Sequence, residues 1–248
     1  VLILEKKVNT NNALILENVK ANWQDKKAIH SLTPFTLLDY PDKTACILWF
    51  AGCNMKCDYC YNPEIVFGKG QLSFSEIFSF LKTRRNLLDA VVLSGGECLI
   101  HQNIIPFVTT IKEMGFLVKM DTNGSKPKVL YSLLNQNLID YVAMDFKGPK
   151  VKFEKIAHLD AYSSFKECLK LLVDSNSIPF EIRTTYHSSL LNPDDIMMMI
   201  DDLCDGGYTN SLYIQNYRNY QDTIKPLPDS SALHPKDFSP NMTKIIFR

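Results

Sequence analysis

The sequence predicts an α/β protein built as a partial, open (β/α)6 barrel of the TIM type. Short apolar segments rich in strand-forming residues alternate with amphipathic helical segments along the chain. Such alternation predicts a parallel sheet with right-handed crossovers. The chain has 248 residues, enough for one domain of barrel size. Because only six strand–helix units are recognisable and a closed TIM barrel needs eight, the barrel is expected to stay open.

The first two predicted strands are short, mostly apolar runs, as buried parallel strands are. The first, TACILWFA, ends at Gly52 and leads directly into a loop rich in cysteine. The six strands are predicted at residues 44–51, 89–93, 116–120, 140–144, 180–186 and 211–215, and the pattern allows a last one at 242–247.

The predicted helices have recognisable start signals. Ser73 precedes a helical pattern and Glu76 follows three residues later, which is a capping-box pattern. Asn192 is followed by Pro193, a favoured first helical residue. Helices are predicted at residues 73–83, 103–114, 128–136, 162–174 and 193–203.

The domain organisation is predicted to be simple. Residues 1–31 carry no chemical motif, and we interpret them as an N-terminal extension of uncertain order or, equally, as a cap over one end of the barrel. Residues 32–248 form the predicted core domain, and they begin with a proline-containing, non-helical stretch. No repeat or linker suggests a second domain.

Composition excludes several classes of function. Lys and Arg total 27 and so do Asp and Glu, so the zero net charge predicts neither a nucleic-acid partner nor an anionic membrane surface. No apolar run is long enough to span a membrane, and the start lacks the pattern of a signal peptide. The seven cysteines are an odd number, which argues against a disulfide framework and favours a reducing, cytoplasmic location.

The loop after the first predicted strand concentrates cysteines. Residues 49–63 read WFAGCNMKCDYCYNP and space Cys53, Cys57 and Cys60 as C-x3-C-x2-C. Three thiolates can hold three irons of a 4Fe–4S cluster and leave the fourth iron open to a small molecule. A structural zinc site would need four ligands, usually from two paired C-x2-C units, and no second unit exists. A chance cluster of buried or zinc-binding cysteines is the alternative.

This spacing resembles the signature of radical S-adenosylmethionine (radical SAM) enzymes. In that family the open iron binds the amino and carboxylate groups of SAM, and the reduced cluster cleaves SAM to methionine and a 5′-deoxyadenosyl radical. The family usually has an aromatic residue before the last cysteine, and here it is Tyr59. The resemblance therefore implies an enzyme whose catalytic centre is a cluster on Cys53, Cys57 and Cys60.

Polar motifs follow the second, third and fourth predicted strands. Gly95-Gly96-Glu97 is an ordinary turn sequence by itself, but it resembles the family's GGE motif, which binds the SAM amino group; Cys98 stands where relatives usually have proline. Asp121, in DTNG, is a turn residue that the resemblance places at the SAM ribose or beside a cation. Asp145 and Lys147, in DFK, match a D-x-K motif that contacts SAM; the alternative is a solvated pair.

Three further residues are weaker SAM-binding candidates. Arg183, if it points inward, needs an anionic partner, and the SAM carboxylate is one. Gln215 ends the sixth strand, where relatives often carry a polar residue near adenine. Tyr61 replaces the histidine of the C-H-N-P form, so it can pack on the cluster or SAM but cannot act as an imidazole.

The finer resemblance, carried by residues 38–43 (LDYPDK), 52–54 (GCN) and 61–63 (YNP), is to the activating enzymes of glycyl-radical enzymes such as anaerobic ribonucleotide reductase. It implies abstraction of a glycine Cα hydrogen from a partner protein and a flavodoxin or ferredoxin-type electron donor. Two alternatives stay open. One is a radical SAM enzyme acting on a small molecule, similar to 7-carboxy-7-deazaguanine synthase, and the other is a non-catalytic iron–sulfur docking module.

Overall fold

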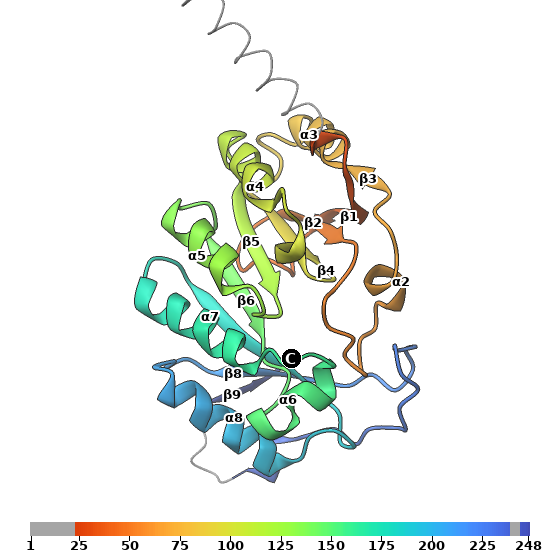
Figure 1. Ribbon diagram of the computed structural model, residues 1–248, viewed down its shortest axis with the longest axis vertical. Helices are drawn as coiled ribbons and strands as arrows, with labels where there is room; N and C mark the ends of the chain where they lie inside the picture. Colours follow the sequence, from red (N-terminus) through yellow and green to blue (C-terminus); the bar gives the residue numbers. More distant parts are fainter. Residues whose placement is uncertain (1–22, 239–243) are drawn as a thin grey trace, which may run out of the picture.

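The computed structural model describes residues 23–238 and 244–248 of the chain. Its centre is a nine-stranded sheet in the order β3-β1-β2-β4-β5-β6-β7-β8-β9 (Figure 1). The strands are β1 (Lys27–Thr36), β2 (Ala45–Phe50), β3 (Leu72–Ser73), β4 (Ala90–Gly95), β5 (Leu117–Thr122), β6 (Tyr141–Asp145), β7 (Phe180–Tyr186), β8 (Leu212–Asn216) and β9 (Ile245–Phe247). From β2 to β9 every neighbouring pair is parallel.

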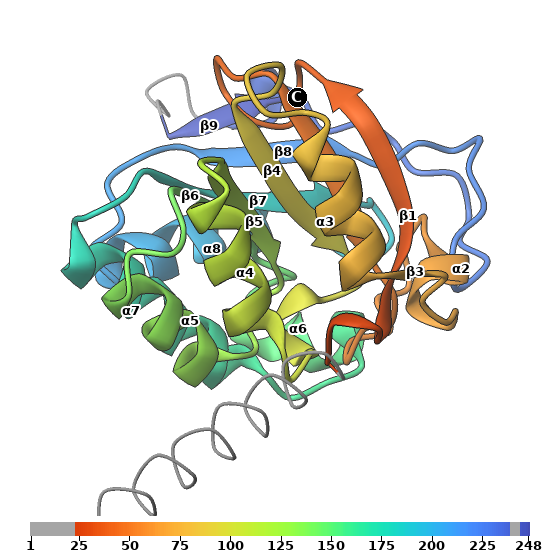
Figure 2. The ribbon, with the colours of Figure 1, turned by 90° about the horizontal axis from the view of Figure 1, so that it is seen from above.

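The helices occupy the connections between these parallel strands. Helices α3, α4, α5, α7 and α8 cover one face of the curved sheet (Figure 2). Their bounds, with those of two short helices nearer the cysteine loop, are α2 (Pro63–Val66), α3 (Phe74–Lys82), α4 (Ile104–Glu113), α5 (Pro127–Asn135), α6 (Lys150–Ala157), α7 (Tyr162–Ser175) and α8 (Pro193–Asp205). Single 3-10 turns lie at Cys98–Ile100 and Pro235–Asp237.

The open α/β barrel predicted from the sequence is confirmed. All six predicted strands are present as β2, β4, β5, β6, β7 and β8, and β9 adds a seventh parallel strand. The two end strands of the sheet, β3 and β9, do not pair with each other, so the barrel is not closed. The two predicted capping boxes, at Ser73 and Asn192, are both formed.

The sheet extends further toward the N-terminus than the sequence indicated. Strand β1 pairs antiparallel with β2, so residues 27–31, assigned above to the extension, belong to the sheet. Pro34, which argues against a helix here, lies at a register shift in β1, where a missing amide donor is tolerated. Residues 1–22 of the predicted extension lie outside the described residues.

The two faces of the sheet differ in the size and polarity of their side chains. The outer face packs large apolar residues such as Leu48 and Phe50 against the helices. The inner face carries a small apolar cluster, Tyr40, Ala45, Ile47, Ala90 and Val92, beside β2 and β4. On β5, β6 and β7 the inner face becomes charged instead. The barrel interior is therefore apolar beside β2 and β4 and polar beside β5, β6 and β7.

None of the helices in residues 23–238 and 244–248 is both long and apolar enough to cross a bilayer.

Candidate active site

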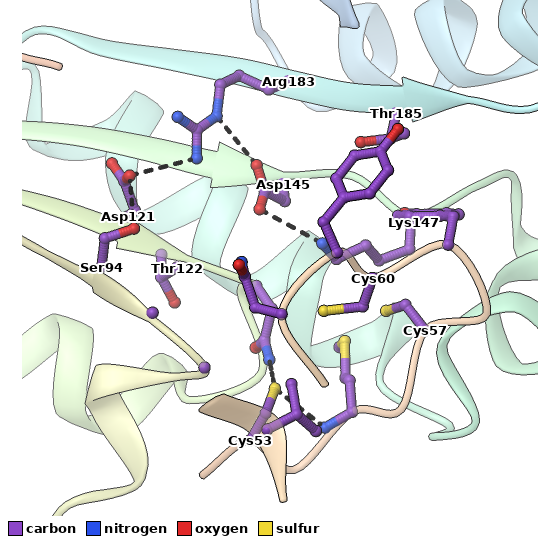
Figure 3. A pocket seen from close by; sticks show the side chains of 18 residues that line it. Cys53, Cys57, Cys60, Ser94, Asp121, Thr122, Asp145, Lys147, Arg183 and Thr185 are labelled. Carbon is purple, nitrogen blue, oxygen red and sulfur yellow. Dashed lines mark hydrogen bonds and ion pairs between the residues drawn. The ribbon is translucent and has the colours of Figure 1, made fainter. Parts of the chain in front are cut away.

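A pocket opens at the carboxyl ends of β2, β4, β5, β6 and β7, where parallel barrels place their ligands (Figure 3). The cysteine loop forms one wall, and charged side chains from the strands form the facing wall. The lining residues are Cys53, Met55, Cys57, Tyr59, Cys60, Tyr61, Asn62, Val66, Ser94, Gly95, Gly96, Asp121, Thr122, Asn123, Asp145, Lys147, Arg183 and Thr185. Thus eleven of the thirteen candidate residues lie together.

The three cysteines of the loop face this pocket as free thiols. Cys57 is buried, whereas Cys53 and Cys60 are half-buried. Burial raises the pKa of Cys57 to about 11, although Lys147 acts in the opposite direction. Thiolates are the metal-binding form, so metal uptake here must release protons.

The donor set fits a cluster better than a single ion. Among the described residues, no three His, Cys, Asp or Glu side chains converge closely enough to hold one metal ion. A tetrahedral zinc site needs four ligands on one ion. In a 4Fe–4S cluster each thiolate binds its own iron, so three thiols spread around one end of a pocket are suitable. The cysteine loop therefore suits a three-cysteine cluster.

Two glycines let the backbone at the end of β4 lie close to the backbone at the start of the cysteine loop. A Cβ on Gly95 would lie 2.4 Å from the Phe50 amide nitrogen, and one on Gly96 would lie 1.9 Å from the Gly52 carbonyl oxygen. Gly95 also has a φ of +114°, a conformation that favours glycine. Any side chain at Gly95 or Gly96 would push the end of β4 away from the cysteine loop.

A chain of half-buried charged side chains forms the opposite wall of the pocket. Lys147 Nζ lies 3.3 Å from Asp145 Oδ2, and Arg183 Nε donates to Asp145 Oδ1 across 3.0 Å. The guanidinium also lies 3.6 Å from Asp121, which accepts a hydrogen bond from the Ser94 hydroxyl at 3.0 Å. Figure 3 shows Asp121, Asp145 and Arg183, from β5, β6 and β7, pointing toward one another. The sequence left the direction of Arg183 open, and in the structure it points inward to Asp121 and Asp145.

The charges of this wall are fixed by their mutual contacts. Burial by itself would lower the pKa of Lys147, but Asp145 outweighs it and the pKa lies well above its usual value. Burial would raise the pKa of Asp145, but Arg183 and Lys147 together lower it. Lys147 and Arg183 are therefore protonated, and Asp145 between them is ionised. The two cations can also hold the carboxylate of a ligand.

The network continues below the pocket into the barrel interior. Lys119 on β5 is 3% exposed, and its Nζ lies 2.5 Å from Asp121 Oδ1. The same ammonium lies 5.9 Å from the centre of the Tyr141 ring. Asp121 is therefore held between a cation beneath it and the guanidinium of Arg183 beside it. The sequence analysis did not single out Lys119, although its alternation with Asp121 on one strand places both on the same face.

Glu97 is placed differently from the sequence-based expectation. Its side chain is fully buried and does not line the pocket. Its carboxylate accepts hydrogen bonds from the Asn123 amide at 2.6 Å, the Leu99 amide at 3.0 Å and the Thr122 hydroxyl at 3.0 Å. Glu97 therefore holds the turn that follows β5 in place. Burial raises its pKa to about 7 despite these donors.

Gln215, the loosest of the candidates, is exposed at the end of β8 and does not line the pocket either.

The two tyrosines of the loop have separate surroundings. Tyr59 is buried, and its hydroxyl has no hydrogen-bond partner among the described residues. Tyr61 accepts a hydrogen bond from the Arg218 amide at 2.6 Å and stacks on Tyr217 with ring centres 5.4 Å apart. Tyr61 thus links the cysteine loop to the segment after β8.

Several pocket residues were not predicted from the sequence as site residues. Asn123 donates from Nδ2 to Cys53 Sγ across 3.7 Å and to Asn54 Oδ1 across 3.0 Å. Thr185 lies two residues after Arg183, so strand alternation places both on the inner face. The same alternation from Val92 identifies Ser94 as an inner-face residue. Cys98 is a functional candidate because it follows the GGE motif directly, where relatives usually have proline, but it is buried and outside the pocket lining.

Comparison with known proteins agrees with the motifs. Residues 47–203 match the Radical SAM superfamily. A protein of Methanocaldococcus jannaschii, provisionally named glycyl-radical enzyme activating enzyme MJ1227, is 33% identical over 186 residues, which is 69% of this chain and 73% of that protein. The 7-carboxy-7-deazaguanine synthase of Thermoplasma acidophilum is 27% identical over 135 residues, covering 52% of this chain and 61% of that enzyme.

Solved structures share the fold. Streptococcus suis SuiB bound to S-adenosylmethionine has a TM-score of 0.53 at 14% identity, covering 69% of this chain and 40% of that one. The native anSMEcpe structure with bound AdoMet has a TM-score of 0.58 at 19% identity, covering 75% of this chain and 55% of that one. This chain thus spans about half the length of those two proteins, and the likeness concerns their barrel domain architecture.

Proposed function

We propose that this chain, which belongs to the radical SAM superfamily, activates a glycyl-radical enzyme by removing a hydrogen atom from a glycine Cα of that partner. The superfamily uses a 4Fe–4S cluster and S-adenosylmethionine. The observation that supports the activase reading is the 33% identity to the M. jannaschii protein, which extends over 73% of that protein's length.

Cys53, Cys57 and Cys60 are the proposed cluster ligands, because their thiols share one wall of the pocket. When bound and reduced, the cluster supplies the electron that cleaves SAM reductively. On the facing wall Lys147 and Arg183 are the proposed partners of the SAM carboxylate, since both cations line the pocket beside Asp145.

The remaining pocket residues are proposed to orient SAM and exclude water. Gly95 and Gly96 line the pocket and keep its wall close to the Phe50 and Gly52 backbone. The Asp121 carboxylate, already held by Lys119 and Arg183, is a fixed acceptor for a ligand hydroxyl or ammonium. Tyr59 has a buried hydroxyl without a partner among the described residues, and this supports its place in the pocket as a ligand contact.

The protein partner and the electron donor are also part of this proposal. A glycyl-radical enzyme is the proposed substrate, and a flavodoxin or ferredoxin-type protein is the proposed donor. Free thiols at all seven cysteines suit a reducing compartment, so we propose that the enzyme works in the cytoplasm.

A second candidate function is a radical SAM reaction on a small molecule. It is favoured by the 27% identity to a 7-carboxy-7-deazaguanine synthase. The two functions differ in whether turnover needs a protein partner.

Anaerobic reconstitution followed by incubation with SAM and dithionite tests the proposal. We expect 5′-deoxyadenosine from the wild type and none from Cys57→Ala. The activase reading further predicts a glycyl-radical EPR signal on an added glycyl-radical enzyme and none when its reactive glycine is replaced by alanine. Product formation from a deazapurine precursor without any protein partner would support the second candidate instead.

A further inference from the structure

The turn that follows β5 contacts the cysteine loop through the side chain of Asn123. Its Nδ2 lies 3.7 Å from Cys53 Sγ and 3.0 Å from Asn54 Oδ1, and it donates to both atoms. The Met55 amide donates to the same sulfur across 3.4 Å. In the described part of the chain, no other side chain donates a hydrogen bond to the sulfur of a loop cysteine. Cys53 therefore differs from the other two cysteines of the loop.

The orientation of the Asn123 amide follows from its neighbours. The Ser125 backbone amide donates to Asn123 Oδ1 across 3.0 Å, so the carbonyl oxygen of the side chain is already used and Nδ2 faces the sulfur. Asn54 accepts from Asn123 with its Oδ1, and its own Nδ2 donates to Ser125 Oγ across 2.8 Å. Turning the Asn123 amide over would place two donors against each other at the Ser125 amide. The hydrogen-bond network therefore fixes Asn123 as a donor to Cys53.

The backbone of Asn123 is held as firmly as its side chain. Its amide donates to Glu97 Oε2 across 2.6 Å, and Glu97 is fully buried. Asn123 itself is 5% exposed. Little water can therefore compete for the sulfur, and a hydrogen bond in such surroundings is stronger than one in solvent. The donor is in place without any movement of the turn.

We propose that Asn123 raises the reduction potential of the cluster by donating a hydrogen bond to the Cys53 thiolate. The inference rests on the proposed function, because it presumes a cluster on the three cysteines. Reduction adds one electron, and part of the added negative charge falls on the thiolate sulfurs. A donor to sulfur therefore stabilises the reduced state more than the oxidised state, and hydrogen bonds to the sulfurs are among the factors that set such potentials. Asn123 acts through Cys53 and is a positioning residue.

This role connects two strand-end motifs to one sulfur. Glu97 follows β4 and holds the Asn123 backbone, and Asn123 follows β5 and donates to Cys53. Residues next to the ligands of a metal site commonly orient those ligands and adjust the metal's properties. The buried position of Glu97, away from the pocket, is suited to this indirect task. A higher potential makes the cluster easier to reduce, so the electron donor needs less driving force.

An anaerobic redox titration of the reconstituted protein, followed by EPR and carried out without SAM, measures the midpoint potential directly. Asn123→Ala removes the donor. Asn123→Asp also removes it but keeps an oxygen that can accept from the Ser125 amide. Ser125→Ala is the matched control, because it removes the hydrogen bond from Asn54 in the same network and leaves both donors to Cys53 in place. Iron and sulfide analysis of each protein accompanies the titration.

We expect the equilibrium constant for one-electron reduction to fall about fivefold in Asn123→Ala, since one hydrogen bond to a charged group is lost. At about 59 mV per tenfold change, this lowers the midpoint potential by about 40 mV. Asn123→Asp should lower the constant about tenfold, or by about 59 mV, because a carboxylate then lies beside the thiolate. Ser125→Ala should keep the wild-type potential, and all variants should bind as much iron as the wild type.

A wild-type potential in either Asn123 variant that carries a full cluster would overturn the proposal. An equal shift in Ser125→Ala would also overturn it, because the effect would then come from the network and not from the donor to sulfur. If neither Asn123 variant takes up iron while Ser125→Ala does, Asn123 serves assembly and the proposal is wrong.

Failure of the proposed function is detected separately. It is the absence of 5′-deoxyadenosine when the loaded wild-type enzyme is reduced with dithionite and given SAM, a result that leaves the comparison of potentials intact. A wild-type protein that takes up no cluster at all would overturn both proposals.

Discussion

Arg183 on β7 and Asp145 on β6 are register partners on neighbouring parallel strands, and Arg183 Nε donates to Asp145 Oδ1 across 3.0 Å. The same guanidinium lies 3.6 Å from Asp121 on β5. One cation therefore sets the positions of two carboxylates that come from separate strands. Together with Lys147 it leaves the facing wall of the pocket with a positive edge.

We predict that Arg183→Gln weakens SAM binding about tenfold while iron content stays at the wild-type level. The substitution removes the charge that offsets Asp121 and Asp145, and it leaves the cysteine loop untouched. Equilibrium dialysis of the reconstituted protein with SAM measures the effect. Lys112→Gln is the control, because Lys112 pairs with Asp140 away from the pocket. Unchanged affinity in Arg183→Gln would contradict the assignment of this wall to the SAM carboxylate.

Lys119→Met should destabilise the protein by about 3 kcal/mol, because removing one partner of a buried ion pair leaves the other uncompensated. The Lys119 side chain is 3% exposed and that of Asp121 is 14% exposed. Lys112→Met breaks a pair whose side chains are 23% and 26% exposed, so it should cost less than about 1 kcal/mol. Urea denaturation of both variants gives the comparison, and similar costs would show that the buried pair adds little.

Gly96→Ala should prevent cluster incorporation, because its Cβ would meet the Gly52 carbonyl oxygen at 1.9 Å, next to Cys53. Gly115→Ala is the matched control. It has a φ of +93°, but its Cβ would meet nothing within 4 Å, so it should cost only about 1 kcal/mol. Iron and sulfide analysis after reconstitution separates the two, and full iron content in Gly96→Ala would refute the close-approach argument.

Cys57→Ala and Cys98→Ala should behave differently although both thiols are buried. Cys57 lines the pocket, whereas Cys98 does not and donates weakly to the Asp121 carbonyl at 3.6 Å. We expect Cys98→Ala to bind as much iron as the wild type and to lose about 1 kcal/mol of stability. Cys57→Ala should lose the cluster signal in the absorption spectrum. Loss of iron in Cys98→Ala would return that residue to the list of functional candidates.

Strands β2 and β4 were predictable because they are buried on both faces and therefore read as uninterrupted apolar runs. The strand Ala90–Gly95 is an example, and the motif that follows it falls at the pocket. Strand β1 was not predicted because it pairs antiparallel near the edge of the sheet, contains Pro34 and has two register shifts. Helix α6 was not predicted because its apolar stripe is short, with Phe153 and Ile156 set among three lysines and a glutamate.

Within the pocket, the motifs predicted which residues meet but not which way each side chain points. Gly95 and Gly96 are pocket residues as expected, whereas Glu97 in the same motif points to Thr122 and Asn123. Only the packing of one turn against the other decides this, and a single sequence carries no signal for it. Lys119 was similarly hidden, since a lysine within a strand is usually expected at a solvated edge.

The buried carboxyl of Glu97 gives the last prediction, a pH dependence with a defined sign. Burial raises its pKa from the model-compound value of 4.5 to about 7 in the folded state. Between these two values the folded state binds more protons than the unfolded state, so the contribution of Glu97 to stability falls as pH rises from 4.5 to 7. The Glu97→Gln variant cannot titrate here. The stability of the wild type minus that of Glu97→Gln should therefore decrease across this window, by at most about 1.4 kcal/mol per pH unit, and level off above pH 7.

Urea denaturation of the reduced apoprotein at several pH values measures this difference. Asp89→Asn is a suitable control, because hydrogen bonds from Thr44 lower the pKa of Asp89 and its contribution has the opposite sign. A difference for Glu97→Gln that rises with pH would mean that the donors from Thr122, Asn123 and Leu99 outweigh burial and hold the carboxylate ionised. In that case Glu97 would act as a charged anchor of the turn after β5, and the lowered pKa would be its signature.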